Sequence, residues 1–387
     1  MEGMIQKYAD KLVNAGLCDS GAPLIGFVDA DVIWNRDDSL QKELQKVFDS
    51  IIINSILFAP PAEPYRTIID YLAASGEPAI YPKDCETRTF IHDLPVARTL
   101  DAGTIVEALK RRKSLIVPGQ GIVTFGTVSP EQAFIVYSSV CFAVFVKFFS
   151  DYLYQTRHGK PSKSFQKAFQ KVMNHVSETV DYPQANLMKG PFNNENDAVS
   201  AIIEAGAKTV EYELVDSFFG NISYRLGQTI YISQTSSSLD ELSGCIDPCP
   251  IDGSSCAGVT ASSELTAHRE TYLRKNISAI IHGHPKFSVI MSMECDNTDC
   301  DHVGECHRRC PQTRYLNGVP VVSGEVGTGP FGLCNTLPAA METREGVIVY
   351  GHGVFTGGNV DFTDAFERLV TIESDCRRVY FQKICTF

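Results

Sequence analysis

Short apolar runs alternate along the chain with segments of helical periodicity. The runs APLIGFVDADVIW (22–34), SIIINSILFAP (50–60) and SLIVPGQGIVTFG (114–126) are typical of strands bounded by turn residues. Segments 1–17 and 41–49 have charges spaced as in amphipathic helices. Strands that alternate with helices predict an α/β protein.

The longest apolar run, AFIVYSSVCFAVFV (133–146), falls short of the roughly 18–20 residues that span a bilayer. We expect a buried core helix there. No secretory signal is visible, so we expect a cytoplasmic protein. The 387 residues carry a net charge of −12 without a basic block, which favours a small substrate over nucleic acid or an anionic membrane. A chain of this length predicts two domains.

Two segments resemble each other. RKSLIVPGQGIVTFGTVSPEQAF (112–134) aligns without a gap with REGVIVYGHGVFTGGNVDFTDAF (344–366), and each predicts a strand, a Gly-x-Gly turn, a second strand and a helix. Chance similarity is the alternative to shared ancestry. Between the glycines stand Gln120 in the first copy and His352 in the second, and imidazole binds transition metals far better than a carboxamide does. We expect domains 1–160 and 161–387, of which only the second binds a metal.

The stretch AIIHGHP (279–285) predicts a strand that enters a turn. Side chains alternate along a strand, so His282 and His284 point to the same side. A zinc ion also needs a third protein ligand, for which His352 is the natural candidate. The alternative is that the His-x-His pair merely satisfies polar groups at a strand end.

Upstream, TASSELTAHRETY (260–272) predicts the start of a helix. Ser262 or Ser263 would be the N-cap, and Glu264 would lie in or near the first turn. The free N–H groups and hydroxyls there suit a phosphate, and Glu264 beside a metal suits a base. A plain capping arrangement is the alternative.

Taken in order, the Gly-Asn-Ile-Ser turn at 220–223, the hydroxyl-rich loop at 235–237, the Ser-Ser-Glu motif and the two histidine turns resemble the class II aldolases of the fuculose-phosphate type. This fold is shared with ribulose-phosphate 4-epimerases, methylthioribulose-phosphate dehydratases and adducin. The resemblance covers about 195–375. It implies a three-layer α/β/α domain with a mainly antiparallel central sheet, preceded here by a related, degenerate α/β domain.

The resemblance also implies roles for individual residues. A divalent metal, usually zinc, would lie on His282, His284 and His352, although Fe²⁺, Mn²⁺ or Co²⁺ also suit three histidines. Glu264 would be the general base. The residues that match phosphate-binding positions are Asn221, Thr235, Ser236, Ser262 and Ser263. Ser236 replaces a glycine of the family, and a side chain at this place could crowd a phosphate.

The activity implied is retro-aldol cleavage of a ketose or ketose phosphate in carbohydrate metabolism, through a metal-stabilised enediolate. A dehydratase or epimerase of a sugar phosphate would use the same site, and a non-catalytic adducin-like binding or structural module is a further alternative. In the family a tyrosine of a neighbouring subunit often supplies the acid, so we expect a homo-oligomer, a dimer or a tetramer. None of the 15 tyrosines is assigned to this role.

Thirteen cysteines give the chain a second candidate metal site. Four of them, Cys295, Cys300, Cys306 and Cys310, lie in one short segment at irregular spacings. We expect that some of them bind a structural zinc ion. Disulfides and free thiols are the alternatives.

Overall fold

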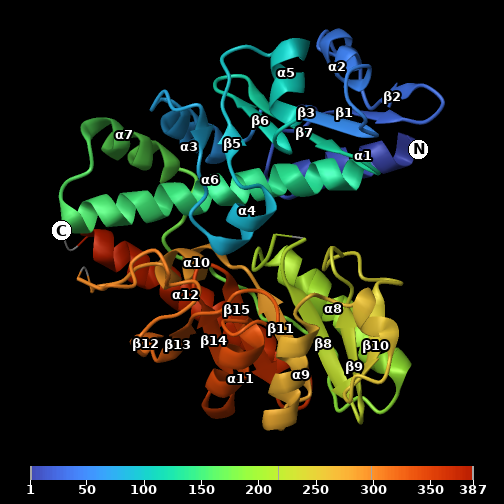
Figure 1. Cartoon of the computed structure of the whole chain (residues 1–387), viewed down its shortest axis with the longest axis vertical. Helices are drawn as coiled ribbons and strands as arrows, with labels where there is room; N and C mark the ends of the chain where they lie inside the picture. Colours follow the sequence, from blue (N-terminus) through green and yellow to red (C-terminus); the bar gives the residue numbers. More distant parts are fainter. Residues whose placement is uncertain (1, 217, 298, 386–387) are drawn as a thin grey trace. The chain divides into compact units, whose positions relative to one another are not determined.

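The computed structural model describes residues 2–216, 218–297 and 299–385, which form two compact units, Met1–Ser177 and Glu178–Phe387 (Figure 1). The boundary lies later than the one expected after residue 160. The reason is the helix Lys163–Val172, whose Phe165 and Phe169 stack on Tyr71 and Tyr152 of the first unit.

The first unit is built around a five-stranded antiparallel sheet in the order β2-β1-β3-β7-β6, with β4 and β5 paired separately. Its strands are β1 (Leu24–Val28), β2 (Val32–Trp34), β3 (Ser55–Ala59), β4 (Ala79–Ile80), β5 (Leu94–Pro95), β6 (Ser114–Val117) and β7 (Gly121–Gly126). Its helices are α1 (Glu2–Asn14), α2 (Gln41–Phe48), α3 (Tyr65–Ala73), α4 (Cys85–Phe90), α5 (Ala102–Leu109), α6 (Pro130–His158) and α7 (Lys163–Val172).

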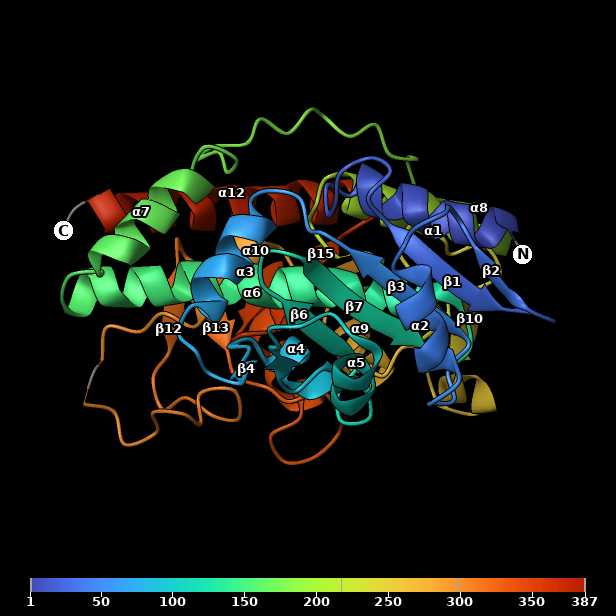
Figure 2. The ribbon, with the colours of Figure 1, turned by 90° about the horizontal axis from the view of Figure 1, so that it is seen from above.

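The apolar run at 133–146 lies in α6, which packs along β3 and β7 (Figure 2). By length and composition alone this helix qualifies as a membrane span, but 94% of its most apolar window is buried inside the protein. Burial in the core explains why this helix is apolar all round. The expectation of a core helix is confirmed.

The second unit contains an eight-stranded sheet in the order β10-β9-β8-β11-β15-β14-β13-β12. Its strands are β8 (Asn221–Leu226), β9 (Thr229–Ser233), β10 (Ile246–Pro250), β11 (Ala279–Gly283), β12 (Arg314–Leu316), β13 (Val319–Val322), β14 (Gly346–Val349) and β15 (Gly353–Gly358). Its helices are α8 (Glu195–Glu211), the 3₁₀ helix η1 (Cys256–Val259), α9 (Leu265–Arg274), α10 (Lys286–Ser292), α11 (Leu333–Thr343) and α12 (Thr363–Cys385).

Helices cover both faces of this sheet. Apolar side chains of α9 and α11 share one buried cluster with alternate residues of the central strands, among them Ile280, Val349 and Phe355. On the other face α8, α10 and α12 pack against β8, β11, β14 and β15. Every strand pair is antiparallel except β13 with β14. The three-layer fold with a mainly antiparallel sheet is therefore as expected.

The first unit repeats the core of the second. Its order β2-β1-β3-β7-β6 corresponds to β9-β8-β11-β15-β14, and the helices α1, α2, α3, α5 and α6 occupy the chain positions of α8, α9, α10, α11 and α12. The register agrees as well, because Ser55 pairs with Gly126 in the first unit as Ala279 pairs with Gly358 in the second. The repeat seen in the sequence thus extends to a whole α/β domain.

Candidate metal centre

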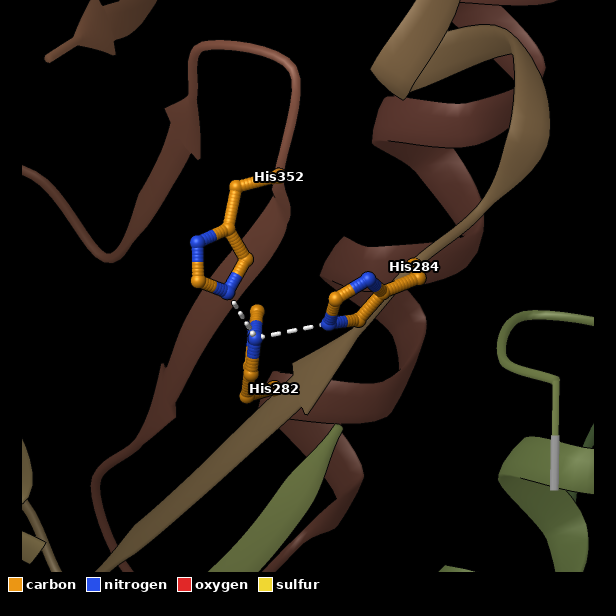
Figure 3. Close-up of side chains that lie close together, drawn as sticks. All are labelled: His282, His284 and His352. Carbon is orange, nitrogen blue, oxygen red and sulfur yellow. Dashed lines mark hydrogen bonds between the residues drawn. The ribbon is translucent and has the colours of Figure 1, made fainter. Parts of the chain in front are cut away.

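Three histidines converge at the end of β11. His282 lies near the end of this strand, His284 follows it, and His352 lies in the turn between β14 and β15 (Figure 3). The Nε2 atom of His282 is 2.9 Å from Nε2 of His284 and 3.1 Å from Nε2 of His352. Zinc–nitrogen bonds of about 2.0–2.1 Å would space ligand atoms roughly 3.3 Å apart, so the three nitrogens suit one ion.

Burial favours the neutral form of imidazole, which is the form that binds metals. His282, His284 and His352 are at most 3% exposed. Burial lowers the pKa of His282 to about 3 and the pKa of His284 well below its usual value. The Nδ1 atom of His282 lies 3.1 Å from the carbonyl oxygen of Val354 and donates to it, which leaves a lone pair on Nε2.

Glu264 closes the group on the side of α9. Its carboxylate oxygens lie 3.3 Å from Nε2 of His282 and 3.1 Å from Nε2 of His352. Burial alone would raise the pKa of Glu264, but its contacts with His282, His352 and the amide of Asn221 oppose this effect and hold the pKa below its usual value. Imidazoles beside an ionised carboxylate are a donor set that suits a divalent transition metal.

Asn221 lies beside the carboxylate. It begins β8 directly opposite His282, and its Nδ2 donates to Glu264 at 2.6 Å. The amide therefore holds the carboxylate in place, and phosphate binding by Asn221 stays a prediction. Among the described residues its buried Oδ1 has no hydrogen-bond partner.

The helix α9 starts later than the sequence indicated. Its N-cap is Glu264, not Ser262 or Ser263, and the Ser262 hydroxyl accepts from the backbone N–H of Glu264. The capping prediction is therefore wrong, because the chain still makes a bridge to the end of β9 at 261–262 and turns into the helix only afterwards. His268 follows Glu264 by one turn, as expected.

Two hydroxyl-bearing loops lie side by side next to this helix start. The backbone N–H of Thr235 donates to the carbonyl oxygen of Thr260, and the backbone N–H of Ser262 donates to the carbonyl oxygen of Ser233. Thr235, Ser236 and Ser263 are exposed, whereas Ser262 is buried. Ser236 has a φ of 62°, so it adopts the left-handed conformation that glycine takes most easily. The loops thus form one surface, and phosphate binding by it stays a prediction.

Several further residues shape the site, although the sequence indicated no role for them. The Phe355 ring stacks on His282 at 3.7 Å, and Ser292 accepts from the N–H of Gly351 at 2.8 Å beside His352. Ser223, in β8, bridges the buried side chains of His268 and Tyr272 at 2.7 and 2.8 Å. Only the i, i+4 spacing of His268 and Tyr272 on α9 hinted that these two side chains share a face.

The four clustered cysteines form no comparable group. Within the described residues, only the three histidines bring three or more ligand atoms within 4.8 Å of one another. Cys295, Cys300, Cys306 and Cys310 are free thiols in this arrangement, as are Cys245, Cys249 and Cys256. A structural zinc ion on these cysteines stays a prediction.

The first unit lacks the histidines at the same places. Strand register sets Phe58 where the second unit has His282, and Leu24 where it has Asn221. Pro60 and Gln120 stand in the places of His284 and His352. The first unit therefore has the fold without the metal ligands.

Comparison with known families agrees with this division. Residues 200–380 match the family described as Class II Aldolase and Adducin N-terminal domain, a range that includes every residue of the centre. No curated protein matches the chain. Similar solved structures include the L-fuculose-1-phosphate aldolase from Thermus thermophilus, at 20% identity over 49% of this chain and 96% of that one, with a TM-score of 0.40.

Two further structures are similar over the same share of the chain. One is an L-fuculose 1-phosphate aldolase, with 25% identity, coverage of 50% of this chain and 89% of that one, and a TM-score of 0.39. The other is a sugar-phosphate aldolase from Thermotoga maritima, with 16% identity, coverage of 49% and 96%, and a TM-score of 0.37.

Proposed function

The second unit belongs to the class II aldolase and adducin family, and on that premise we propose that the chain is a metal-dependent lyase. The proposed reaction is retro-aldol cleavage of a ketose or ketose phosphate. The observation that carries the proposal is the convergence of three buried imidazoles on one point beside an ionised carboxylate. Burial of polar groups costs free energy unless they are hydrogen-bonded, paired or coordinate a metal, and a bound ion would satisfy all three imidazoles at once.

His282, His284 and His352 would hold the ion, and zinc is the metal we propose. When bound, the ion supplies a Lewis acid that polarises a carbonyl and stabilises the negative charge left on the substrate oxygen. Glu264, kept ionised and fixed by Asn221, accepts the proton of the substrate hydroxyl and returns it after the carbon–carbon bond breaks. The hydroxyls of Thr235, Ser236, Ser262 and Ser263 are proposed to bind the phosphate.

We propose a cytoplasmic homo-oligomer, as the resemblance to the fuculose-phosphate aldolases implies. A dehydratase or an epimerase would use the same side chains as the lyase. The three activities therefore have to be distinguished by analysis of the reaction products.

The first test joins metal content to turnover. The purified chain is expected to bind one zinc ion through the histidines, besides any ion on the cysteines, and His352→Gln, which copies Gln120 of the first unit, is expected to bind one zinc ion fewer than wild type. A panel of ketose 1-phosphates is then screened for release of an aldehyde. Glu264→Gln should keep the metal but lower kcat by about 10²–10⁴-fold.

Glu270→Gln is the matched control, because it removes the same charge further along α9, where Glu270 pairs with Arg269. It should retain wild-type turnover. Zinc that stays bound to His352→Gln, or turnover that Glu264→Gln does not reduce, would contradict the proposal.

A further inference from the structure

A second buried carboxylate, Glu373 of α12, contacts the start of α10 and not the histidines. The side chain is 2% exposed. One oxygen accepts from the N–H of Phe287 at 3.0 Å, and the other accepts from the N–H and the hydroxyl of Ser288, both at 2.8 Å. Both oxygens are therefore used to hold the first turn of α10.

The cation beside this carboxylate is itself largely buried. Arg377 lies 3.8 Å from Glu373, is 14% exposed, and places its guanidinium 4.5 Å from the centre of the Phe287 ring. Burial raises the pKa of Glu373, and Arg377 with the hydrogen bonds from α10 opposes this. Buried ion pairs are often no better for stability than apolar side chains of the same volume, so stability alone gives no reason for this pair.

The first unit shows that the fold forms without the pair. The aligned repeats place Cys141 and Phe145 of α6 where α12 has Glu373 and Arg377. Both residues of α6 are buried. The start of α3, which corresponds to α10, is instead capped locally, since Glu63 accepts from the N–H of Thr67. The charged pair therefore occurs in the unit that has the histidines.

The segment that Glu373 holds leads directly from a metal ligand. His284 and Pro285 precede α10, so the clamped residues are three and four positions after His284. The ring of His282 is oriented by Val354, but Nδ1 of His284 is buried without a hydrogen-bond partner among the described residues. The orientation of His284 therefore depends on its backbone and on the Phe219 ring stacked at 5.5 Å.

We propose that Glu373 is a positioning residue that fixes α10 and thereby aims Nε2 of His284 at the ion. The inference rests on the proposed metal centre. Outer contacts of this kind typically change metal affinity by 10–100-fold, because ligand atoms must stay within about 0.2 Å of their places.

The test compares cobalt and zinc binding in matched variants of the full chain. Glu373→Met with Arg377→Phe replaces the pair by apolar side chains, as in the first unit. Ile372→Val is the control, because Ile372 is a buried neighbour on α12 and its counterpart in the first unit is Val140. Zinc affinity is measured by competition with a chelator, and the visible spectrum of bound Co²⁺ reports the ligand geometry.

We expect the double variant to bind zinc about 10–100-fold more weakly and to show an altered Co²⁺ spectrum, while Ile372→Val matches wild type. If the double variant fails to fold, Glu373→Gln is used for the test in its place. Its amide oxygen keeps one of the two hydrogen-bond acceptors, so the expected loss of zinc affinity is smaller than that expected for the double variant. Wild-type affinity and spectrum in the folded apolar variant, or in Glu373→Gln where only that variant folds, would overturn the inference.

The outcomes also separate this inference from the proposed reaction. A wild-type chain that binds zinc but cleaves no ketose phosphate fails the proposed reaction and leaves the positioning role intact, provided that the variants differ as expected. A wild-type chain that binds no metal through the histidines overturns both.

Discussion

Gly353 is the first residue of β15 and lies against two of the histidines. Adding one methyl group there should weaken zinc binding, whereas the same change in the first unit should lower only the stability of the fold. A Cβ atom there would collide with the carbonyl oxygen of Gly283 and would lie 2.8 Å from Cε1 of His282 and 3.1 Å from Cδ2 of His284. The His282 contact is about 0.6 Å short of the 3.4 Å at which ordinary contact begins. Because a metal site tolerates ligand displacements of about 0.2 Å, Gly353→Ala should weaken zinc binding by about 10–100-fold.

The first unit offers a control with nearly the same collision. A Cβ atom on Gly121 would lie 2.7 Å from both the carbonyl oxygen of Ala59 and the Phe58 ring, which stand where the second unit has Gly283 and His282. Overpacking costs about 1–3 kcal/mol in either unit, or roughly 2–4 °C in the melting temperature for each kcal/mol.

The assay is zinc affinity by chelator competition together with thermal unfolding of the metal-free chains. Gly353→Ala and Gly121→Ala should both lower the melting temperature, and only Gly353→Ala should weaken zinc. The reasoning is refuted if Gly353→Ala binds zinc as wild type does, or if Gly121→Ala loses as much affinity.

Three further outcomes follow from the same geometry. Asn221→Leu copies Leu24 of the first unit and removes the hydrogen bond that holds the Glu264 carboxylate. We expect kcat/KM to fall at least about 10-fold while zinc stays bound. Equal losses of zinc and activity would assign Asn221 to metal binding instead. Zinc at 100 times its Kd should raise the free energy of unfolding by about 2.7 kcal/mol, and His352→Gln should abolish the gain in a thermal shift with and without chelator. Burial raises the pKa of Asp84 to about 6 from an ordinary 3.8, so the folded state binds the proton of this carboxyl more tightly than the unfolded state does. The stability that this proton contributes is fully present below pH ~4 and is lost as the pH rises through 6. Urea unfolding should therefore show Asp84→Asn gaining about 2 kcal/mol on wild type between pH 4 and pH 7, and a gap that does not change with pH would contradict the burial argument.

Features that depend on neighbouring residues could be predicted from the sequence. The alternation in 279–284 indicated β11 with both histidines on one side, and the gapless repeat indicated the two strand–turn–helix units with Gln120 in the place of His352. The family resemblance supplied the layers of the fold, and the Gly-His-Gly turn of the second repeat supplied the candidate third ligand. These signals work because strand periodicity and glycine turns are local properties of the backbone.

The parts that the sequence did not reveal are contacts between residues far apart in the chain. Asn221 bonds to Glu264 because β8 pairs with β11 opposite His282, which no spacing along the chain indicates. The helix start at Glu264 is set by a bridge to the end of β9, and the polar role of Glu373 is set by the packing of α12 on α10. A buried glutamate in a helix is visible in the sequence only as an interruption of its apolar face.

The two units indicate what this fold requires and what the metal centre adds. Both form the same five-stranded core, but one fills the space at the strand ends with Leu24, Phe58 and Pro60, and the other with polar side chains. Burying an imidazole or a carboxylate costs free energy unless each polar atom has a partner, whereas an apolar ring gains from burial. The polar version is therefore expected to be stable only as a set, with Val354, Asn221 and the proposed ion as partners. Replacing one member leaves the others unsatisfied, while replacing all of them gives an ordinary apolar core. The first unit accordingly keeps the fold with apolar side chains at these places, and intermediate variants such as His352→Gln should be the least stable.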